Sequence, residues 1–232
     1  DALGTHIIEQ SRTAITAAIN ALPQGSWRHS MRIDGFEEPI DLVAELTISN
    51  GIIHVDFAGS SGTSDFGINC PMCYTEAYTA CGAKCVVAPG IPNNAGTLDA
   101  ITVSAPDNTI VNAPHPCAVV SRSTIGHMLP DVIFGCLHQA LPDRVPAEGT
   151  SNLWNVKLGA GHGITERTEH ETTAFMLMAF HSGGAGARPK LDGLSATPYP
   201  SGVRNVPVEI SEAITPIVIW RKELRTDSGG TG

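Results

Sequence analysis

The stretch IDLVAELTISNGIIHVDF, residues 40–57, has the pattern of a β-hairpin. Apolar residues recur at every second position of its first half, as in a strand with one buried face; these are Leu42, Ala44, Leu46 and Ile48. Asn50-Gly51 follows, the dipeptide that most strongly favours a two-residue hairpin turn. Residues 52–57 supply the returning strand. The pattern predicts that an antiparallel pair of strands forms part of the core.

Helical and strand-like patterns surround this hairpin. Residues 6–22 and 71–87 carry apolar side chains at helical spacing. Residues 125–140 predict a third helix, with a kink near its start at Pro130. Further strands are predicted at 99–104, 174–180 and 217–224. Strands and helices do not alternate regularly, and the order therefore predicts an α+β fold.

The composition excludes several classes of protein. Only 16% of the residues are charged, against roughly 25% in an average soluble domain. The formal net charge of -9 argues against nucleic acid and against an anionic membrane surface as partners. No apolar run is long enough to predict a membrane-spanning helix, and no secretory signal is visible. We expect a cytoplasmic protein whose surface is either neutral or covered by another protein.

The cysteines permit two interpretations. Four of them form the pattern C-x-x-C followed by C-x-x-x-C, which loosely resembles a zinc site; these are Cys70, Cys73, Cys81 and Cys85. The same region also has the spacing of a helix, in which cysteine behaves as a small apolar residue. We therefore favour reduced cytosolic thiols over a zinc site, for these four and for Cys117 and Cys136.

Four further features of the sequence are ambiguous. The run GGAGAR, residues 183–188, could hold an anion on its backbone amides, but a tight turn packed against another backbone is the favoured interpretation. Glu209 and Glu212 would share a face in a helix, but Val206-Pro207-Val208 predicts extended chain that separates them. The DSGG at 227–230 matches a protease nucleophile segment, yet the Ala-His-Cys setting of the histidine in such enzymes is absent. His162, between two glycines, suits either a site or simple exposure.

Several motifs occur in an order that resembles the hydantoinase B/5-oxoprolinase family. They are VDFAGS at 55–60, IPNNAG at 91–96, ALPDRVPA at 140–147, GGAGAR at 183–188 with Asp192-Gly193, NVPVE at 205–209 with Glu212, and LRTDSGGTG at 224–232. Each motif alone is weak, whereas their order and spacing are specific. The resemblance implies that residues 1–232 are one continuous unit from the central to C-terminal portion of a longer B-type subunit.

The resemblance also implies a function. Family members act with a hydantoinase A-like, ATP-binding subunit and hydrolyse cyclic amides such as N-methylhydantoin, 5-oxoproline or lactams. Related enzymes carboxylate acetone or acetophenone, and a ketone carboxylase is therefore the alternative. ATP and a divalent metal are expected in the complex but not on this chain. The expected partners of the chain are the A-type subunit, the rest of its own subunit and a small-molecule substrate. We expect the segment alone to be inactive.

Polar residues inside the matched motifs, together with Asn112 between two of them, are the candidates for chemistry. They are Asp56, Asn94, Asn112, Arg188 and Glu209. Loops held by glycine and proline can direct such side chains into a site, although asparagine and aspartate also commonly satisfy backbone groups of their own loops. A third hypothesis follows, in which the segment is a structural interface module without a catalytic residue. Interface centres are depleted in charge, which suits the low charge of the chain.

Overall fold

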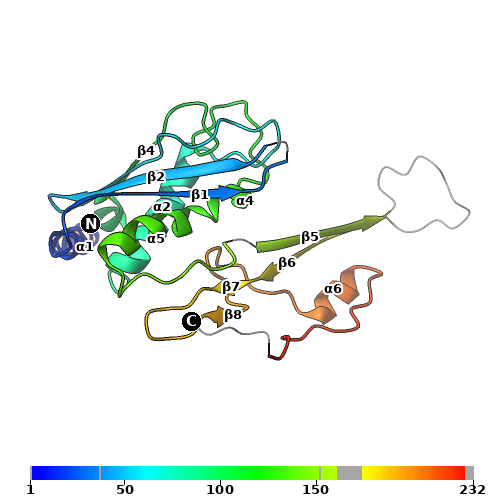
Figure 1. The fold of residues 1–232 in the computed structure, drawn as a ribbon. Helices are drawn as coiled ribbons and strands as arrows, with labels where there is room; N and C mark the ends of the chain where they lie inside the picture. Colours follow the sequence, from blue (N-terminus) through cyan, green and yellow to red (C-terminus); the bar gives the residue numbers. More distant parts are fainter. Residues whose placement is uncertain (1, 37, 152, 161–173, 228–232) are drawn as a thin grey trace, which may run out of the picture.

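The computed structural model describes residues 2–36, 38–151, 153–160 and 174–227. Helices and strands occur in a mixed order, which confirms the predicted α+β class. Figure 1 shows a sheet covered by helices and, beside it, a long two-stranded ribbon with several small elements.

The larger sheet carries the predicted hairpin at its centre. Its strands follow the order β1 (Gly25–Ile33), β2 (Ile40–Ser49), β3 (Ile52–Asp56) and β4 (Ile101–Ser104). Between β2 and β3, Ser49 pairs with Ile52 around a turn in which Asn50 and Gly51 have φ angles of 51° and 76°. Positive φ at both turn residues matches the twist of the strands. β4 lies parallel to β3 at the edge of the sheet.

Two helices bury one face of this sheet. They are α2 (Met72–Val87) and α5 (Leu129–Ala140). α2 confirms the helix predicted at 71–87. α5 packs on β1 and β2, while α2 packs on α5 and β4. The alternating apolar residues of β2 are fully buried there, and Cys136 of α5 donates a hydrogen bond to the carbonyl oxygen of Ala44 at 3.4 Å. α2 and α5 approach closely, since a Cβ added at Gly82 would lie 2.8 Å from Cα of Pro130.

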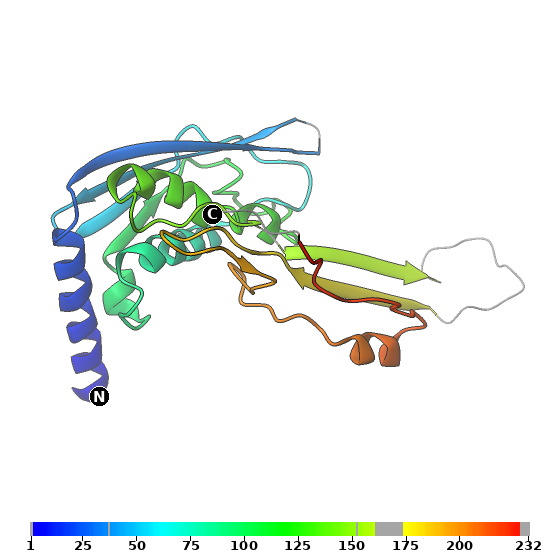
Figure 2. The ribbon, with the colours of Figure 1, turned by 60° about the horizontal axis from the view of Figure 1, so that its bottom comes forward.

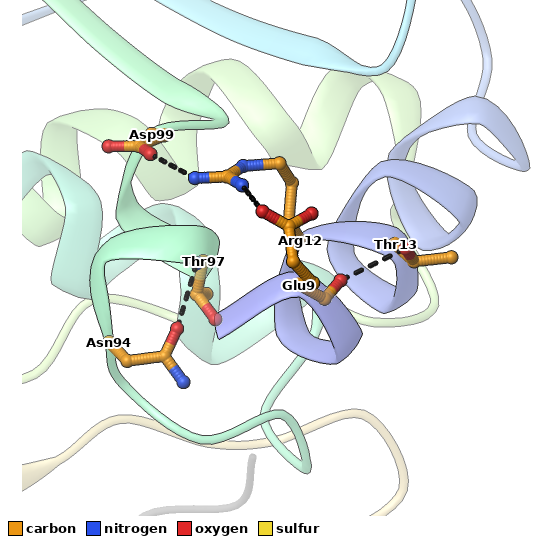
Figure 3. A network of polar contacts seen from close by, with 6 residues as sticks. All are labelled: Glu9, Arg12, Thr13, Asn94, Thr97 and Asp99. Carbon is orange, nitrogen blue, oxygen red and sulfur yellow. Dashed lines mark hydrogen bonds and ion pairs between the residues drawn. The ribbon is translucent and has the colours of Figure 1, made fainter. Parts of the chain in front are cut away.

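The first helix, α1 (Ala2–Asn20), begins four residues before the predicted 6–22. Ile15 and Ile19 are fully buried on its core face. It packs on the short helix α3 (Ala95–Leu98). Figure 3 shows Arg12 of α1 between two carboxylates, 2.6 Å from Glu9 and 2.8 Å from Asp99, so that an ion pair joins α1 to the residue after α3.

The rest of the chain forms the ribbon and the elements beside it. β5 (Leu153–Ala160) and β6 (Phe175–Ser182) pair antiparallel along their whole length. β7 (Gly184–Ala185), β8 (Leu194–Ser195) and α6 (Val208–Ile214) follow. Figure 2 shows the ribbon extending away from the sheet. Among the described residues, no helix is long and apolar enough to cross a membrane.

Several predictions of individual elements were wrong. Residues 125–140 are not one kinked helix, because α4 (Ser123–Gly126) ends before α5 begins with Pro130 in its first turn. Proline suits the first turn of a helix, because the backbone N–H groups there have no acceptor within the helix and the N–H that proline lacks is not needed. Residues 217–224 pair with no strand among the described residues. Four strands were not expected from the sequence: β1, β5 and the two-residue strands β7 and β8. Of these, β1 does alternate apolar and polar residues.

Candidate functional site

A cleft of about 660 Å³ lies where the two parts of the chain meet. One wall is α5 with His29 of β1, and the opposite wall consists of residues 142–148 and 187–189. These two segments overlap the family-like motifs at 140–147 and 183–188. The complete lining is His29, Asp131, Phe134, Gly135, His138, Gln139, Pro142, Val145, Pro146, Ala147, Glu148, Ala187, Arg188 and Pro189.

Asp131 is the buried acidic group of this cleft. It lies in the first turn of α5, directly after Pro130, and is 1% exposed. Its Oδ2 accepts a hydrogen bond from the hydroxyl of Ser151. Its Oδ1 is buried and has no hydrogen-bond partner among the described residues. A carboxyl group in such a position is expensive to ionise, because the charge is removed from water without an adequate partner.

The surroundings of Asp131 favour its neutral acid form. Burial is the largest effect and raises the pKa of this carboxyl above its ordinary value. The negative charge of Glu148 raises the pKa further, whereas the hydrogen bond from Ser151 and the nearby backbone of Gly149 lower it. Acids whose pKa is shifted by burial inside a cleft are typical of functional sites. Asp131 is therefore the strongest candidate in the cleft.

The wall formed by α5 and β1 depends on a glycine. A Cβ added at Gly135 would lie 2.1 Å from Cδ2 of His29, so the imidazole rests directly on the helix. One turn later, Gln139 donates hydrogen bonds to the carbonyl oxygens of Arg28 at 2.9 Å and Gly135 at 3.0 Å. These contacts hold His29 and α5 in one wall.

The opposite wall depends on close backbone contact between the glycine-rich run at 183–188 and residues 147–148. The amide of Ala147 donates to the carbonyl oxygen of Ala187 at 2.7 Å. A Cβ added at Gly186 would lie 2.2 Å from the carbonyl oxygens of both Ala147 and Glu148. Carbonyl oxygens at this distance favour the tight turn over an anion site. Arg188 is also turned inward on its own loop, donating from Nε and Nη2 to the carbonyl oxygen of Asp192 at 3.2 and 3.0 Å.

Asp56 lies outside this cleft, on the face of the sheet away from α5. Its Oδ1 accepts a hydrogen bond from the hydroxyl of Ser104 at 3.0 Å. Ser104 also contacts Nε2 of His54 at 3.1 Å, and Nδ1 of His54 contacts the hydroxyl of Thr102 at 2.9 Å. One tautomer of His54 makes this a continuous chain of hydrogen bonds across the edge of β3 and β4.

Both candidate asparagines make local structural contacts. Asn94 caps α3, since its Oδ1 accepts from the amide of Thr97 at 3.4 Å, and its Nδ2 donates to Ser11 of α1 at 2.8 Å. Figure 3 shows the cap beside the Arg12 ion pairs. Asn112 donates from Nδ2 to the carbonyl oxygen of Ala105 at 2.9 Å and to Asp107 at 3.2 Å. These contacts account for both side chains without a ligand.

The prediction that Glu209 lies in extended chain was wrong. Pro207 caps α6, and Glu209 lies in its first turn, where Glu212 falls on the same helix face. Glu212 instead accepts a hydrogen bond from the amide of Ile219 at 2.8 Å. Glu209 is exposed and does not line the cleft.

The cysteines do not gather into one site. All six are free, and Cys70 is buried whereas Cys73 and Cys85 are exposed. Cys81 and Cys85 lie one turn apart on α2 and contact each other. The hydrogen bond from Cys81, followed by the charge of Lys84, lowers the pKa of Cys85 to about 6.

Within the described ranges, no group of three or more histidine, cysteine, aspartate and glutamate side chains could hold a metal ion. The described residues therefore do not fit the divalent metal that the resemblance implies for the complex, and no metal ligand is assigned to them. His162 and residues 228–230 of the DSGG motif lie outside the described residues.

Of the five sequence candidates, the structure brings only Arg188 into the cleft. Sequence reasoning missed Asp131. A signal for it was present, because an aspartate stands inside the apolar run LPDVIF at 129–134. An ionisable residue within an otherwise apolar helix face indicates either a partner or a function.

Comparisons with known proteins match the whole chain. The model of the family described as hydantoinase B/oxoprolinase matches residues 1–232. An uncharacterized protein of Methanocaldococcus jannaschii is 33% identical over 83% of this chain and 32% of its own length. The B-type subunit of a candidate D-/L-hydantoinase from a Pseudomonas strain is 26% identical over 100% of this chain and 40% of its own length. The beta subunit of the caprolactamase of Pseudomonas jessenii is 33% identical over 61% of this chain and 24% of its own length.

Two solved structures share the fold. The ATP-dependent caprolactamase from Pseudomonas jessenii matches with a TM-score of 0.81 and 23% identity, covering 98% of this chain and 40% of that chain. A nucleotide-free acetone carboxylase matches with a TM-score of 0.71 and 19% identity, covering 90% of this chain and 30% of that chain. The chain thus spans between about a third and two fifths of the length of the first two relatives.

Proposed function

Because the chain belongs to the hydantoinase B/oxoprolinase family, we propose that it is part of the B-type subunit of an ATP-dependent hydrolase that opens cyclic amides. The cleft around Asp131 is the observation that supports a role in chemistry. Two family-like motifs, far apart in the chain, form one of its walls, and a buried acid lies in the other. Hydantoin, 5-oxoproline and lactam rings are small cyclic amides that fit within a cleft of this size.

The proposal divides the work between chains. ATP is bound by an A-type partner subunit, and the divalent metal by parts of the B-type subunit that residues 1–232 do not span. The residues of this chain bind and orient the ring, exclude water and supply a proton-bearing group at Asp131. The complex is cytoplasmic, in keeping with six free thiols. The segment alone is inactive.

The test uses the complete B-type chain assembled with its A-type partner. Candidate rings are 5-oxoproline, hydantoin and ε-caprolactam, and the measurements are ADP formation and the ring-opened product. ADP formation should depend on one of these rings. Acetone or acetophenone with bicarbonate forms the second arm, and a carboxylated product there would favour the ketone carboxylase instead. If no cyclic amide is consumed in the presence of ATP, the proposed hydrolase is wrong.

A pair of variants tests the cleft in the same assay. Arg188→Ala shortens a residue of the cleft lining and removes the guanidinium that holds its loop through the carbonyl oxygen of Asp192. Arg204→Ala removes another exposed arginine, which does not line the cleft. We expect turnover to fall in the first variant and to stay unchanged in the second. If neither variant changes turnover or assembly, Arg188 has no role and the interface-module hypothesis gains support.

A further inference from the structure

Asp131 lines the cleft and holds a buried oxygen atom whose hydrogen-bonding capacity is unused among the described residues. Oδ2 is engaged by Ser151, whereas the buried Oδ1 has no partner among the described residues. Buried polar atoms in native proteins nearly always have a partner, and an exception indicates a ligand or a function. Asp131 makes no ion pair with any described residue, and Arg188, the arginine of the lining, is directed to the carbonyl oxygen of Asp192.

A neutral carboxyl group has one O–H donor beside one carbonyl acceptor. An amide closed into a small ring must be cis, and its N–H and C=O therefore point out along the same edge. The two edges are complementary, since each donor faces the other's acceptor. An open-chain secondary amide is almost always trans and therefore cannot make both bonds to one carboxyl. An ionised carboxylate has only acceptors and would repel the amide oxygen.

The rest of the cleft suits the remainder of such a ring. Phe134, Pro142, Val145 and Pro146 supply apolar surface for its methylene groups. Ser151 can remain bound to Oδ2, because a carboxyl oxygen accepts at two lone pairs. The volume of about 660 Å³ exceeds what a single small ring requires and leaves room beside the amide edge.

We propose that the Asp131 carboxyl binds the cis-amide edge of the cyclic substrate through a pair of hydrogen bonds. The choice of ligand rests on the proposed function. The pairing orients the amide carbonyl within the cleft and places a proton beside its oxygen. Asp131 is thus a specificity-determining residue, which selects lactam-like rings over open-chain amides.

The experiment measures equilibrium binding of 2-pyrrolidinone to the complete B-type chain in its complex, without ATP. N-methyl-2-pyrrolidinone is the matched probe, because it has the same ring without the N–H. We expect N-methylation to weaken binding by about tenfold, the value of one hydrogen bond to a buried group. Asp131→Leu should lose binding, whereas Asp131→Asn, which keeps a donor beside an acceptor, should retain it within about threefold. Thermal unfolding checks that each variant folds, and if Asp131→Leu does not, the two probes on wild type and Asp131→Asn decide.

The pH dependence supplies a second readout. Wild-type binding should weaken as pH rises and Asp131 ionises, whereas the Asn variant should not show this loss. The other groups near Asp131 or lining the cleft are Glu148, His29, His138, Arg188 and Tyr199. All of them remain in the Asn variant, and any pH dependence that persists there belongs to them. Equal pH profiles for wild type and Asn would overturn the proposal.

The outcomes separate this inference from the proposed function. If 2-pyrrolidinone does not bind, or binds equally well after N-methylation and in Asp131→Leu, the cis-amide pairing is wrong even where ATP-dependent ring opening occurs. If binding depends on Asp131 as expected but no cyclic amide is opened with ATP, the pairing holds and the proposed hydrolase is wrong.

Discussion

Gly186 rests directly on Ala147, so that a Cβ added at Gly186 would lie 2.2 Å from the carbonyl oxygen of Ala147. The amide of Ala147 in turn donates a hydrogen bond to the carbonyl oxygen of Ala187, the residue after Gly186, at 2.7 Å. This contact joins the two segments that form one wall of the cleft. A side chain at Gly186 would therefore separate them.

Gly186→Ala should destabilise the chain by about 1–3 kcal/mol, the usual range for overpacking. Because the clash is with backbone, a rotamer change cannot relieve it. Gly90→Ala is the matched control, since a Cβ at Gly90 meets nothing within 4 Å. Urea unfolding measures both. Equal stability of the two variants would show that the wall accommodates a methyl group.

Asp131→Asn should change how stability depends on pH. Burial in the folded chain raises the pKa of this carboxyl. Below the pKa of the unfolded state the carboxyl is neutral in both states, and its ionisation does not affect the free energy of unfolding. As pH rises through the folded pKa, wild type loses stability that the Asn variant keeps. The free energy of unfolding of the variant, relative to wild type, should therefore grow as pH rises from the unfolded pKa of about 3.9 to the folded pKa, and level off above it. A constant difference across this range would contradict burial as the dominant effect.

Asn94→Ala should lower stability by about 1 kcal/mol, because it removes the cap of α3. Asn94→Ser keeps an oxygen that can cap and should restore most of this loss. Thermal unfolding of both variants gives the comparison. In the assembled enzyme, KM should stay unchanged in Asn94→Ser. A large loss of turnover in this variant, with normal stability, would return Asn94 to the catalytic candidates.

Cys85 should be alkylated faster than the buried thiols. Its pKa is lowered to about 6, whereas burial raises that of Cys136 to about 11 and that of Cys70 to about 12. Thiolate is the reactive form, and iodoacetamide at neutral pH should therefore modify Cys85 well before Cys70 or Cys136. Mass spectrometry of digests follows each site. Cys81→Ala should slow the reaction at Cys85, and an unchanged rate would mean that the contact between the two thiols has no effect.

Local patterns were enough to predict much of the first part of the fold. The hairpin follows from alternation and from Asn50-Gly51, because both depend only on neighbouring residues. The helix at 71–87 follows from spacing in the same way. The wrong predictions fell where the local pattern was ambiguous. Residues 217–224 begin with the apolar run IVIW, which is rich in strand-forming residues, but they pair with no described strand. Pro207 begins a helix instead of preventing one.

The candidate site could be predicted much less well. Motif residues drew attention to Asp56 and Asn94, yet the contacts of these side chains are with the edge of the sheet and with the cap of α3. Asp131 stands in none of the matched motifs. Its only signal was an acidic residue among apolar ones, which does not reveal whether a partner exists.

The sequence by itself determined the α+β class, the central hairpin, the main core helices and the resemblance to a family. Each of these rests on short-range periodicity or on ordered motifs. Only the tertiary structure decided where the cleft lies and which acid it contains. The walls come from segments far apart in the chain, and the pKa of Asp131 is raised by burial, a property of the packed molecule that no local sequence pattern encodes.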